Sequence, residues 1–492
     1  MNLAGIDTLA KAPFADGDVL IGGRWRAASD GRSYAVYDPA TGDPVREVSA
    51  AGPADARASV DAAESAAAGW RATPPRRRSE ILHETFRLMR EHTDTLARLI
   101  VLENGKVYRD AAAEVGYAAE FFRWFAEEAV RIGSSFGDAP AGGFRHVVRK
   151  HPVGVTAFVT PWNFPAAMAT RKIAPALAAG CPVLLKPAPE TPLTALAVAA
   201  LLTEAGLPDG LLNVLPTDRA QETVATWLGD ERVRKFSFTG STATGRVLLG
   251  QAAANVVNVT MELGGNAPFV VCADADVDAA VRGAMDAKMR GGGEVCIAAN
   301  RFYVHTDVAA EFTERFGAAM AAVRVGPGLE DGVTLGPMIN AASVDRLRSL
   351  VDDAVSRGAH IAARGTVPHG PGHYHPATVL TDVPDDARIL HEEVFGPVAP
   401  VCVFTDEDEM LARANATVHG LASYVYSRDV GRALRIAERL EAGMVGVNRG
   451  LLSDPAAPFG GVKQSGLGRE GGREGIEAFL ETQYIALDWP TA

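Results

Sequence analysis

The stretch that decides the fold spans residues 153–262 and opens with the apolar run VGVTAFVT at 153–160. Further short apolar runs follow it: PVLLKP (182–187), LLNVLP (211–216), VRKFSFTG (233–240) and VVNVTMEL (256–263). Segments of helical character lie between them, such as PLTALAVAALLTEA at 192–205, which Gly206 ends. Strands that alternate with helices of this length predict βαβ units, and therefore a parallel sheet with helices on both faces.

The same alternation resumes after residue 266 and predicts a second α/β domain. Its predicted elements are strands at 268–272 and 301–305, and helices at 276–290 and from about 307. Three further segments are irregular in composition. We expect a surface loop in GSSFGDAPAGG (133–143), an edge strand in FRHVVRKHP (144–152) and a shaped, glycine-rich loop in PFGGVKQSGLGREGG (458–472).

Length and charge limit the classes of protein to consider. A chain of 492 residues is too long for one hydrophobic core, and 47% hydrophobic with 22% charged residues is typical of a globular protein. The 48 basic and 60 acidic residues give a net charge of -12, which argues against a nucleic-acid partner. An anionic substrate would be repelled overall, so its site would need arginines of its own.

The cysteines and the longest uncharged run bear on location. The four cysteines are Cys181, Cys272, Cys296 and Cys402, and no two of them are close in sequence. So few cysteines in a chain of this length predict a reducing, cytoplasmic setting. Residues 1–14 lack a basic start followed by an apolar run, so we expect no signal peptide. Residues 152–170 are uncharged, but clustered prolines there would not suit a helix in lipid, and we predict no membrane span. The histidines of HGPGHYH (369–375) lie in a glycine- and proline-rich turn without nearby carboxylates, so we predict no metal.

Two residue types suited to covalent catalysis stand next to glycines. Cys296 follows three glycines in RGGGEVCIAANRF (290–302), where a close backbone approach suits a nucleophile. Glu262 ends an apolar strand and precedes Gly-Gly in TMELGGNAP (260–268), at the sheet edge where ligands bind. The alternatives are an inert buried cysteine and a solvated glutamate at a strand end.

Two strand-to-helix turns suggest contacts to a ligand. In FTGSTATGRV (238–247), Gly240 and Ser241 open a helix whose N–H groups suit a pyrophosphate, although the turn is not the GxGxxG fingerprint. In TPWNFP (160–165), Asn163 is held between prolines and could donate its amide to an oxyanion. A plain turn and an Asx-turn are the respective alternatives.

Together these segments resemble the aldehyde dehydrogenase superfamily, with motifs in the family's order along nearly the whole chain. The motifs are TPWNFP, LLKPAPETP, FTGSTATG, MELGGNAP, GGGEVC, HEEVFGPV and PFGGVKQSGLGREGG. The resemblance implies an α/β fold with a Rossmann-type cofactor domain, an α/β catalytic domain and a small β oligomerisation element. The implied ranges are 1–130 with 152–262 for NAD(P) binding, 263–470 for catalysis, and 131–151 with 471–492 for oligomerisation into dimers or tetramers.

The resemblance also implies roles for individual residues. Cys296 matches the nucleophile that forms a thiohemiacetal and then a thioester, and Glu262 matches the base that activates water. Asn163 and the backbone N–H of Cys296 match the oxyanion hole, and Lys172 matches a lysine near the active site. The implied contacts to NAD or NADP are Trp162, Lys186, Gly240, Ser241, Glu393 and Phe395.

Within the superfamily the chain is most similar to succinate-semialdehyde dehydrogenases. Arg171, Arg290 and Ser453 match the residues that bind the carboxylate of the substrate there, and two guanidiniums with a hydroxyl suit such a group. One arginine in a structural ion pair is the alternative. Glutarate semialdehyde and a broader aliphatic or aromatic range are alternative substrates. A CoA-acylating enzyme would not need Glu262, and a non-enzymatic relative would not be expected to retain Cys296.

Three positions depart from the family pattern. Glu294 stands where glutamine is common, and its charge would disfavour a thiolate unless it points away or is paired. Pro189 stands where NAD-preferring relatives often have glutamate, which favours NADP, although the adjacent Glu190 could compensate. Ala298 stands where some relatives carry a second cysteine.

Overall fold

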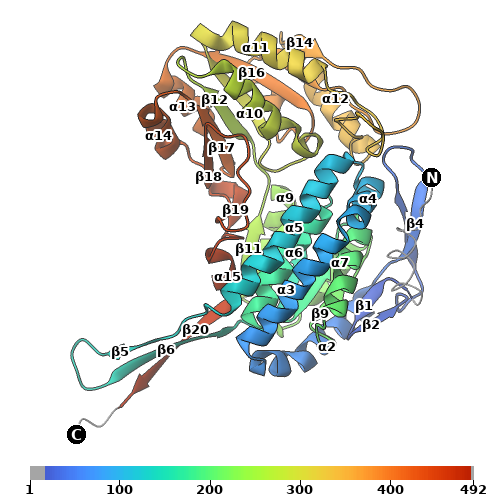
Figure 1. Ribbon diagram of the computed structural model, residues 1–492, viewed down its shortest axis with the longest axis vertical. Coiled ribbons are helices and arrows are strands. Elements are labelled where there is room, and N and C mark those ends of the chain that lie inside the picture. Colours follow the sequence, from blue (N-terminus) through green and yellow to red (C-terminus); the bar gives the residue numbers. More distant parts are fainter. Residues whose placement is uncertain (1–16, 489–492) are drawn as a thin grey trace.

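The computed structural model describes residues 17–488, which form two lobes and a projecting arm (Figure 1). The lower lobe is built on a sheet with the strand order β19-β11-β10-β7-β8-β9-β1-β2. Neighbours from β11 to β9 are parallel, whereas β19, β1 and β2 pair antiparallel. The strands are β1 (Val19–Ile21), β2 (Arg24–Arg26), β7 (Val155–Val159), β8 (Val183–Lys186), β9 (Leu212–Val214), β10 (Val233–Thr239), β11 (Asn258–Glu262) and β19 (Gly466–Leu467).

The order of these strands places a crevice at the centre of the sheet. From β7 the chain adds β8 and β9 on one side, then returns to add β10 and β11 on the other. The order therefore reverses between β7 and β10, and ligands of such sheets bind beyond the carboxyl ends of the strands at this reversal. The predicted Rossmann-type arrangement is confirmed.

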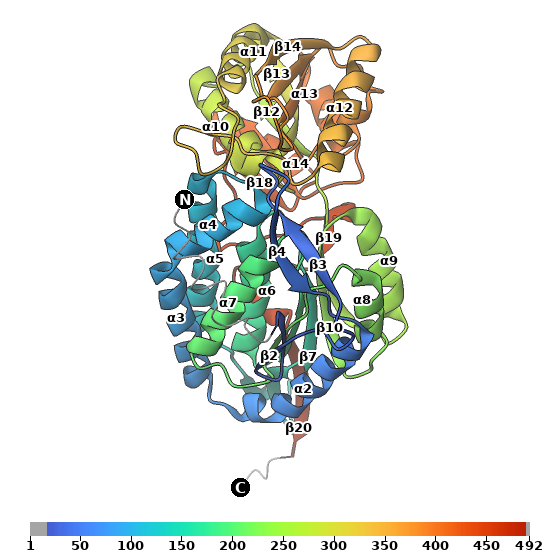
Figure 2. The ribbon, with the colours of Figure 1, turned by 90° about the vertical axis from the view of Figure 1, so that its right-hand side faces the viewer.

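Helices cover both faces of this sheet (Figure 2). On one face lie α3 (Pro75–Glu91), α4 (Thr93–Asn104), α5 (Tyr108–Ala129), α6 (Pro165–Ala179) and α7 (Pro192–Glu204). On the other lie α2 (Pro53–Ala72), α8 (Ala220–Leu228) and α9 (Thr242–Ala253). Helix α6 begins at Pro165, whose fixed φ suits a first turn, and ends at Gly180 with φ of 102°. Double coverage explains why every residue of β7 is buried.

The upper lobe contains a second, largely parallel sheet, as predicted, with the strand order β14-β15-β16-β13-β12-β17-β18. Its strands are β12 (Ala267–Val271), β13 (Ala299–His305), β14 (His360–Arg364), β15 (Thr378–Thr381), β16 (Val398–Phe404), β17 (Ala422–Tyr426) and β18 (Met444–Val447). Its helices are α10 (Val277–Met289), α11 (Thr306–Ala321), α12 (Ala341–Ser356), α13 (Glu407–Asn415) and α14 (Val430–Arg439).

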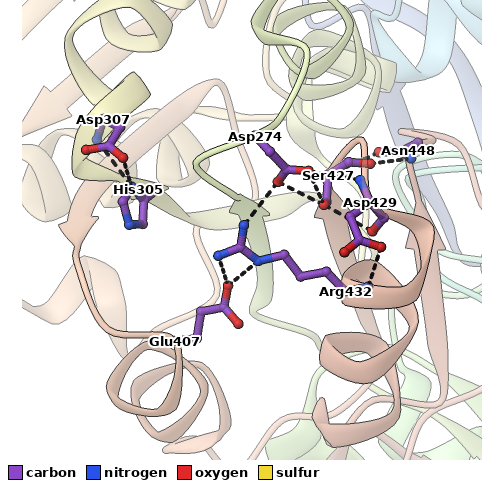
Figure 3. Close-up of polar contacts among 8 residues, drawn as sticks. All are labelled: Asp274, His305, Asp307, Glu407, Ser427, Asp429, Arg432 and Asn448. Atoms are coloured by element: carbon purple, nitrogen blue, oxygen red, sulfur yellow. Dashed lines mark hydrogen bonds and ion pairs between the residues drawn. The ribbon is translucent and has the colours of Figure 1, made fainter.

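An ion-pair and hydrogen-bond network lies at the carboxyl edge of this second sheet (Figure 3). Asp274, just after β12, accepts hydrogen bonds at 2.9 Å from the Ser427 hydroxyl, which follows β17. Arg432 on α14 joins Asp274, at 3.3 Å, to Glu407 on α13. The opposite, amino edge of β12 and β13 is the edge that faces the first sheet.

The arm is a small antiparallel sheet with the order β20-β6-β5. Two predictions were wrong here. Ser135–Asp138 forms strand β5 rather than a loop, because its backbone pairs with β6 (Arg145–Pro152). β6 is the middle strand rather than an edge, because β20 (Leu480–Leu487) pairs along its other side from a distant part of the sequence.

The remaining elements are short: a hairpin of β3 (Ser33–Tyr37) and β4 (Pro44–Ser49), helix α15 (Glu474–Glu477), and 3-10 turns at Arg290–Gly293, Arg388–Leu390 and Lys463–Ser465. The glycine-rich segment 458–472 is mostly irregular, as predicted, but its strand β19 pairs with β11 of the first sheet. The predicted domain ranges stay a prediction. The expected absence of a signal peptide concerns residues 1–14, outside the described residues. Across residues 17–488, every helix is too short or too polar to cross a membrane.

Candidate active site

A cavity of about 470 Å³ opens between the two lobes, where the strand order of the first sheet reverses. Asn163 reaches it from the loop after β7, Gly240 and Ser241 from the turn after β10, and Glu262 from the end of β11. Cys296 reaches it from the loop before β13. The carboxyl edge of one sheet thus meets the amino edge of the other around a single space.

Most of the predicted site residues line this cavity. They are Cys296, Glu262, Asn163, Trp162, Gly240, Ser241, Glu393, Phe395, Arg171, Arg290 and Ser453. Lys172 and Lys186 do not line it; both are buried behind its wall. Sequence reasoning also missed lining residues that lie outside the family motifs: Tyr117, Met168, Ser343 and Arg346. It did not single out Phe459, which lies within the glycine-rich motif.

The three glycines before Cys296 are required by the backbone. Gly291, Gly292 and Gly293 have φ angles of 53°, 69° and 80°, the left-handed region that other residues rarely adopt. Close packing then fixes the position of Cys296. A Cβ on Gly265 would lie 2.3 Å from the carbonyl oxygen of Cys296, and Tyr424 donates its hydroxyl to the Ile297 carbonyl at 2.8 Å.

The thiol of Cys296 is protonated at neutral pH in this structure. Burial raises its pKa to about 12, and the nearby carboxyls of Glu393 and Glu262 act in the same direction, while Arg171 opposes them. Cys181, Cys272 and Cys402 are also free thiols, all buried. Cys296 therefore needs a proton acceptor, or a positive charge supplied by a ligand, to react as a thiolate.

Glu294 does not face the nucleophile. Its side chain lines a separate small cavity beside Lys106 and Gly336, and its carboxyl accepts the Ile339 N–H at 3.2 Å. Burial raises its pKa to about 8, so the group is mostly neutral at pH 7. The departure from the family's glutamine therefore places no full charge next to Cys296.

Glu262 shares a buried charge network with residues behind the cavity. Neither of its carboxyl oxygens has a hydrogen-bond partner within residues 17–488. Burial raises its pKa well above the usual value; the adjacent Glu470 adds to this effect, and Lys172 and Arg171 oppose it. Lys172 donates to the Ser237 hydroxyl at 2.7 Å and is paired with Glu470. Lys172 thus acts on Glu262 through its charge and does not itself line the cavity. Glu470, near the end of the glycine-rich segment, was not predicted as a site residue.

Asn163 is held with its amide at the cavity wall. Its Nδ2 donates to the carbonyl of Glu294 at 2.9 Å, which leaves a second N–H on the same nitrogen. Its Oδ1 has no partner among the described residues. The amide therefore links the loop after β7 to the loop that carries Cys296.

The two arginines differ in how they are engaged. Arg171 on α6 donates to the Tyr117 hydroxyl at 2.6 Å, stacks 4.0 Å from the Phe459 ring and lies 3.7 Å from Glu470. Arg290 lies only over aromatic rings, 5.1 Å from Phe164 and 5.7 Å from Tyr117, and pairs with no carboxylate in the described part of the chain. Arg290 is therefore the freer cation, and Arg171 is partly engaged by the protein.

Another group of lining residues has features suited to a dinucleotide. Ser241 caps α9 by accepting the Thr244 N–H at 3.3 Å, and the buried hydroxyl of Thr239 has no partner among residues 17–488. The Trp162 and Phe395 rings meet edge to face at 5.4 Å. Glu393 accepts the Gly265 N–H at 3.1 Å, and burial raises its pKa to about 7.

The histidines at 369–375 do not converge on a metal. His375 is buried, its Nδ1 lies 2.9 Å from the Pro376 carbonyl oxygen, and burial lowers its pKa to about 4. The described residues contain no group of three or more histidine, cysteine or acidic side chains placed to hold a metal ion.

Cys296 thus lines a crevice that has the position of a dinucleotide site in a doubly wound sheet. The profile of the aldehyde dehydrogenase family matches residues 25–485. The chain therefore belongs to the aldehyde dehydrogenase family and is an oxidoreductase.

Several known proteins are similar along nearly their whole length. A succinate-semialdehyde dehydrogenase of Paenarthrobacter nicotinovorans is 51% identical over 89% of this chain and 97% of that protein. A 3-sulfolactaldehyde dehydrogenase of Pseudomonas putida is 48% identical over 95% of this chain and 96% of that protein. A glutarate-semialdehyde dehydrogenase of P. putida KT2440 is 48% identical over 95% of this chain and 97% of that protein. The crystal structure of an Escherichia coli NADP-dependent enzyme, 45% identical, superposes with a TM-score of 0.94 over 96% of this chain and 98% of that one.

Proposed function

We propose that this protein oxidises succinate semialdehyde to succinate with NADP or NAD as the oxidant. The observation that carries the proposal is that Cys296 shares its cavity with the guanidiniums of Arg171 and Arg290 and with the hydroxyl of Ser453. A third lining arginine, Arg346, donates instead to the backbone carbonyls of Glu393 and Val394. An aldehyde group alone gives no reason for two guanidiniums in the same cavity, whereas a second, anionic end of the substrate does. The three relatives named above act, by their names, on aldehydes that carry an acid group, which supports this reading.

The cofactor would lie at the carboxyl edge of the first sheet. The N-terminus of α9, with Gly240 and Ser241, suits a pyrophosphate, and the unpaired hydroxyl of Thr239 offers a further polar contact. Lys186 and Glu393 are the residues we assign to the two riboses. When bound, NAD or NADP supplies the acceptor for the hydride that leaves the aldehyde carbon. Pro189 carries no charge against the extra phosphate of NADP, so we favour NADP.

Cys296 forms the covalent bond. Its sulfur adds to the aldehyde carbon while the thiol proton passes to solvent water, and the carbonyl oxygen becomes an alkoxide. The free N–H of the Asn163 amide and the backbone N–H of Cys296 stabilise this oxygen. Loss of hydride from the same carbon converts the thiohemiacetal to a thioester.

Glu262 completes the reaction by hydrolysis. As a carboxylate it takes a proton from a water molecule, whose oxygen adds to the thioester carbon. The carbon–sulfur bond then breaks, which releases the acid and restores Cys296. Lys172 and Arg171 supply the positive charge that favours the carboxylate form of Glu262 against its burial and against Glu470. Lys172 is thus a positioning residue in this proposal.

Guanidiniums alone do not fix the length of the substrate. Glutarate semialdehyde, one methylene longer, is the second candidate, because Arg290 is attached at the end of α10 and has no ion pair that fixes its position within residues 17–488.

We extend the proposal to assembly. We propose a cytoplasmic homo-oligomer of two or four subunits that pair through residues 131–151 and 471–492. We assign 1–130 with 152–262 to cofactor binding and 263–470 to catalysis.

The test is a panel of aldehydes assayed by reduced-cofactor absorbance with NAD and NADP separately, on the wild-type protein and on Cys296→Ala. We expect the highest kcat/KM for succinate semialdehyde and no turnover by the variant, whose cofactor Kd should be unchanged. Substantial activity of Cys296→Ala would refute the mechanism, and a higher kcat/KM for butanal than for any acid-ended aldehyde would refute the substrate.

A further inference from the structure

A buried lysine holds the backbone of the residue that we assign to the oxyanion hole. The Lys106 ammonium donates to the carbonyl oxygen of Asn163 at 2.6 Å. It lies 4.0 Å from the centre of the Phe164 ring, and its side chain is only 4% exposed. Lys106 does not line the main cavity, so it acts on the reaction only through residues that do.

Glu114 on α5 is the partner of this lysine and the cap of the next helix. One carboxyl oxygen accepts the Lys106 ammonium at 2.5 Å. The other accepts the N–H groups of Ala166 and Ala167, at 2.9 and 3.3 Å, in the first turn of α6. The residue before α6, Phe164, provides no side-chain cap of its own. A carboxylate from a neighbouring helix therefore binds the free N–H groups and the positive end of α6.

The two contacts fix one short segment from both sides. Lys106 holds the carbonyl of Asn163, and Glu114 holds the N–H groups that start three residues later. The Asn163 side chain is tied in turn to the Glu294 carbonyl, on the loop of the nucleophile. A displacement of about 1 Å in a catalytic group can slow a reaction by on the order of a hundredfold.

We infer that the Lys106–Glu114 pair positions the amide of Asn163 for the developing oxyanion, and that its loss slows formation of the covalent intermediate. The inference rests on the oxyanion role proposed for Asn163. It assigns to two residues outside the cavity an effect on the first chemical step rather than on cofactor binding, because Lys106 holds the backbone of Asn163, which we assign to the oxyanion and not to the cofactor.

The chain contains a matched control for a purely structural cap. Glu103, at the end of α4, accepts the N–H groups of Leu193 and Thr194, at 2.7 and 2.9 Å, in the first turn of α7. It is fully buried, as Glu114 is. No residue of α7 lines the cavity. Glu103→Gln and Glu114→Gln therefore change the same kind of helix cap. Only Glu114 is paired with Lys106, which holds the Asn163 carbonyl, whereas burial raises the pKa of Glu103 to about 8.

The experiment compares single-turnover rates with cofactor affinity in the full-length enzyme. The rate of the first burst of reduced cofactor reports thioester formation, and quenching of protein fluorescence by NADPH gives its Kd. We expect Glu114→Gln and Lys106→Met to lower the burst rate about 10- to 100-fold with the Kd changed less than about threefold. Lys106→Arg, which keeps the charge, should recover much of the rate. Glu103→Gln should lower Tm but leave the burst rate near wild type.

A double variant separates this inference from the proposed function. If Glu114 acts through Asn163, then Asn163→Ala with Glu114→Gln should be no slower than Asn163→Ala alone. Multiplicative losses in the double variant, or equal burst rates for Glu114→Gln and Glu103→Gln, would overturn the inference and leave the oxyanion role intact. An unchanged burst rate in Asn163→Ala would instead overturn the oxyanion role itself, and the inference with it. If Lys106→Met fails to fold, Lys106→Arg and Glu114→Gln still decide the question.

Discussion

Replacing Arg290 by methionine should lower kcat/KM for succinate semialdehyde about 10- to 150-fold. Arg290 stacks on Tyr117 and Phe164 and pairs with no carboxylate within the described ranges, so its charge is available to a substrate. One charge-assisted hydrogen bond contributes about 1.5–3 kcal/mol, and each 1.36 kcal/mol corresponds to about a tenfold change in rate. Methionine keeps an unbranched side chain over the two rings.

Arg290 is a sharper test than Arg171. Arg171 lies 3.7 Å from Glu470 and is one of the cations that oppose the raised pKa of Glu262. Its removal would therefore disturb the proposed base as well as the anion site. Arg290 is not among the charges with the largest effect on the pKa of Glu262.

The assay compares succinate semialdehyde with butanal, which has the same chain length and no carboxylate. General damage to the loop before Cys296 would slow both substrates equally, so the ratio of the two losses isolates the charge. The kcat/KM for butanal should change less than about threefold, which corresponds to less than about 1 kcal/mol. The kcat/KM of Arg290→Lys for succinate semialdehyde should lie between those of the wild type and of Arg290→Met. Equal losses on both substrates would show that Arg290 is structural and would leave the acid end of the substrate without support.

Three further changes test other parts of the site. Glu262→Gln should keep the burst of reduced cofactor but accumulate an acyl-enzyme visible by mass spectrometry, because only hydrolysis needs its carboxylate. In the wild type, the raised pKa of Glu262 should make the turnover rate increase with pH on the acid side. A turnover rate that does not change with pH there would contradict this role. Pro189→Glu should shift the kcat/KM ratio from NADP towards NAD by charge repulsion, and a strong NAD preference already in the wild type would refute the cofactor reading. Glu294→Gln should change kcat/KM at pH 7 less than about threefold, because the carboxyl is mostly neutral there. Since its folded pKa of about 8 exceeds its unfolded value of 4.5, the wild type should lose stability between about pH 4.5 and 8 relative to this variant, and a Tm difference that does not change with pH would refute the raised pKa.

The sequence by itself determined the two α/β lobes and named the residues of the cavity to which we assign chemistry. The alternation of apolar runs and helices depends on local patterns of period 2 and 3.6, and these patterns are independent of distant contacts. Glycines 291–293 predicted a close backbone approach before Cys296, and the structure adds that all three residues are left-handed, a conformation that favours glycine. The resemblance to the family named further residues of the cavity wall, but it missed Tyr117, Met168, Ser343 and Arg346.

Only the tertiary structure decided which way buried side chains face and which charges they meet. Arg171 and Lys172 are neighbours on α6 and both are buried, yet the first lines the cavity and the second pairs with Glu470, nearly 300 positions later. Glu294 is two residues from Cys296 but points into a different cavity. The pKa of a buried group depends on burial and on charges brought close by folding, which spacing in the sequence does not reveal. The same long-range packing made FRHVVRKHP a middle strand, because its second neighbour lies at the far end of the chain.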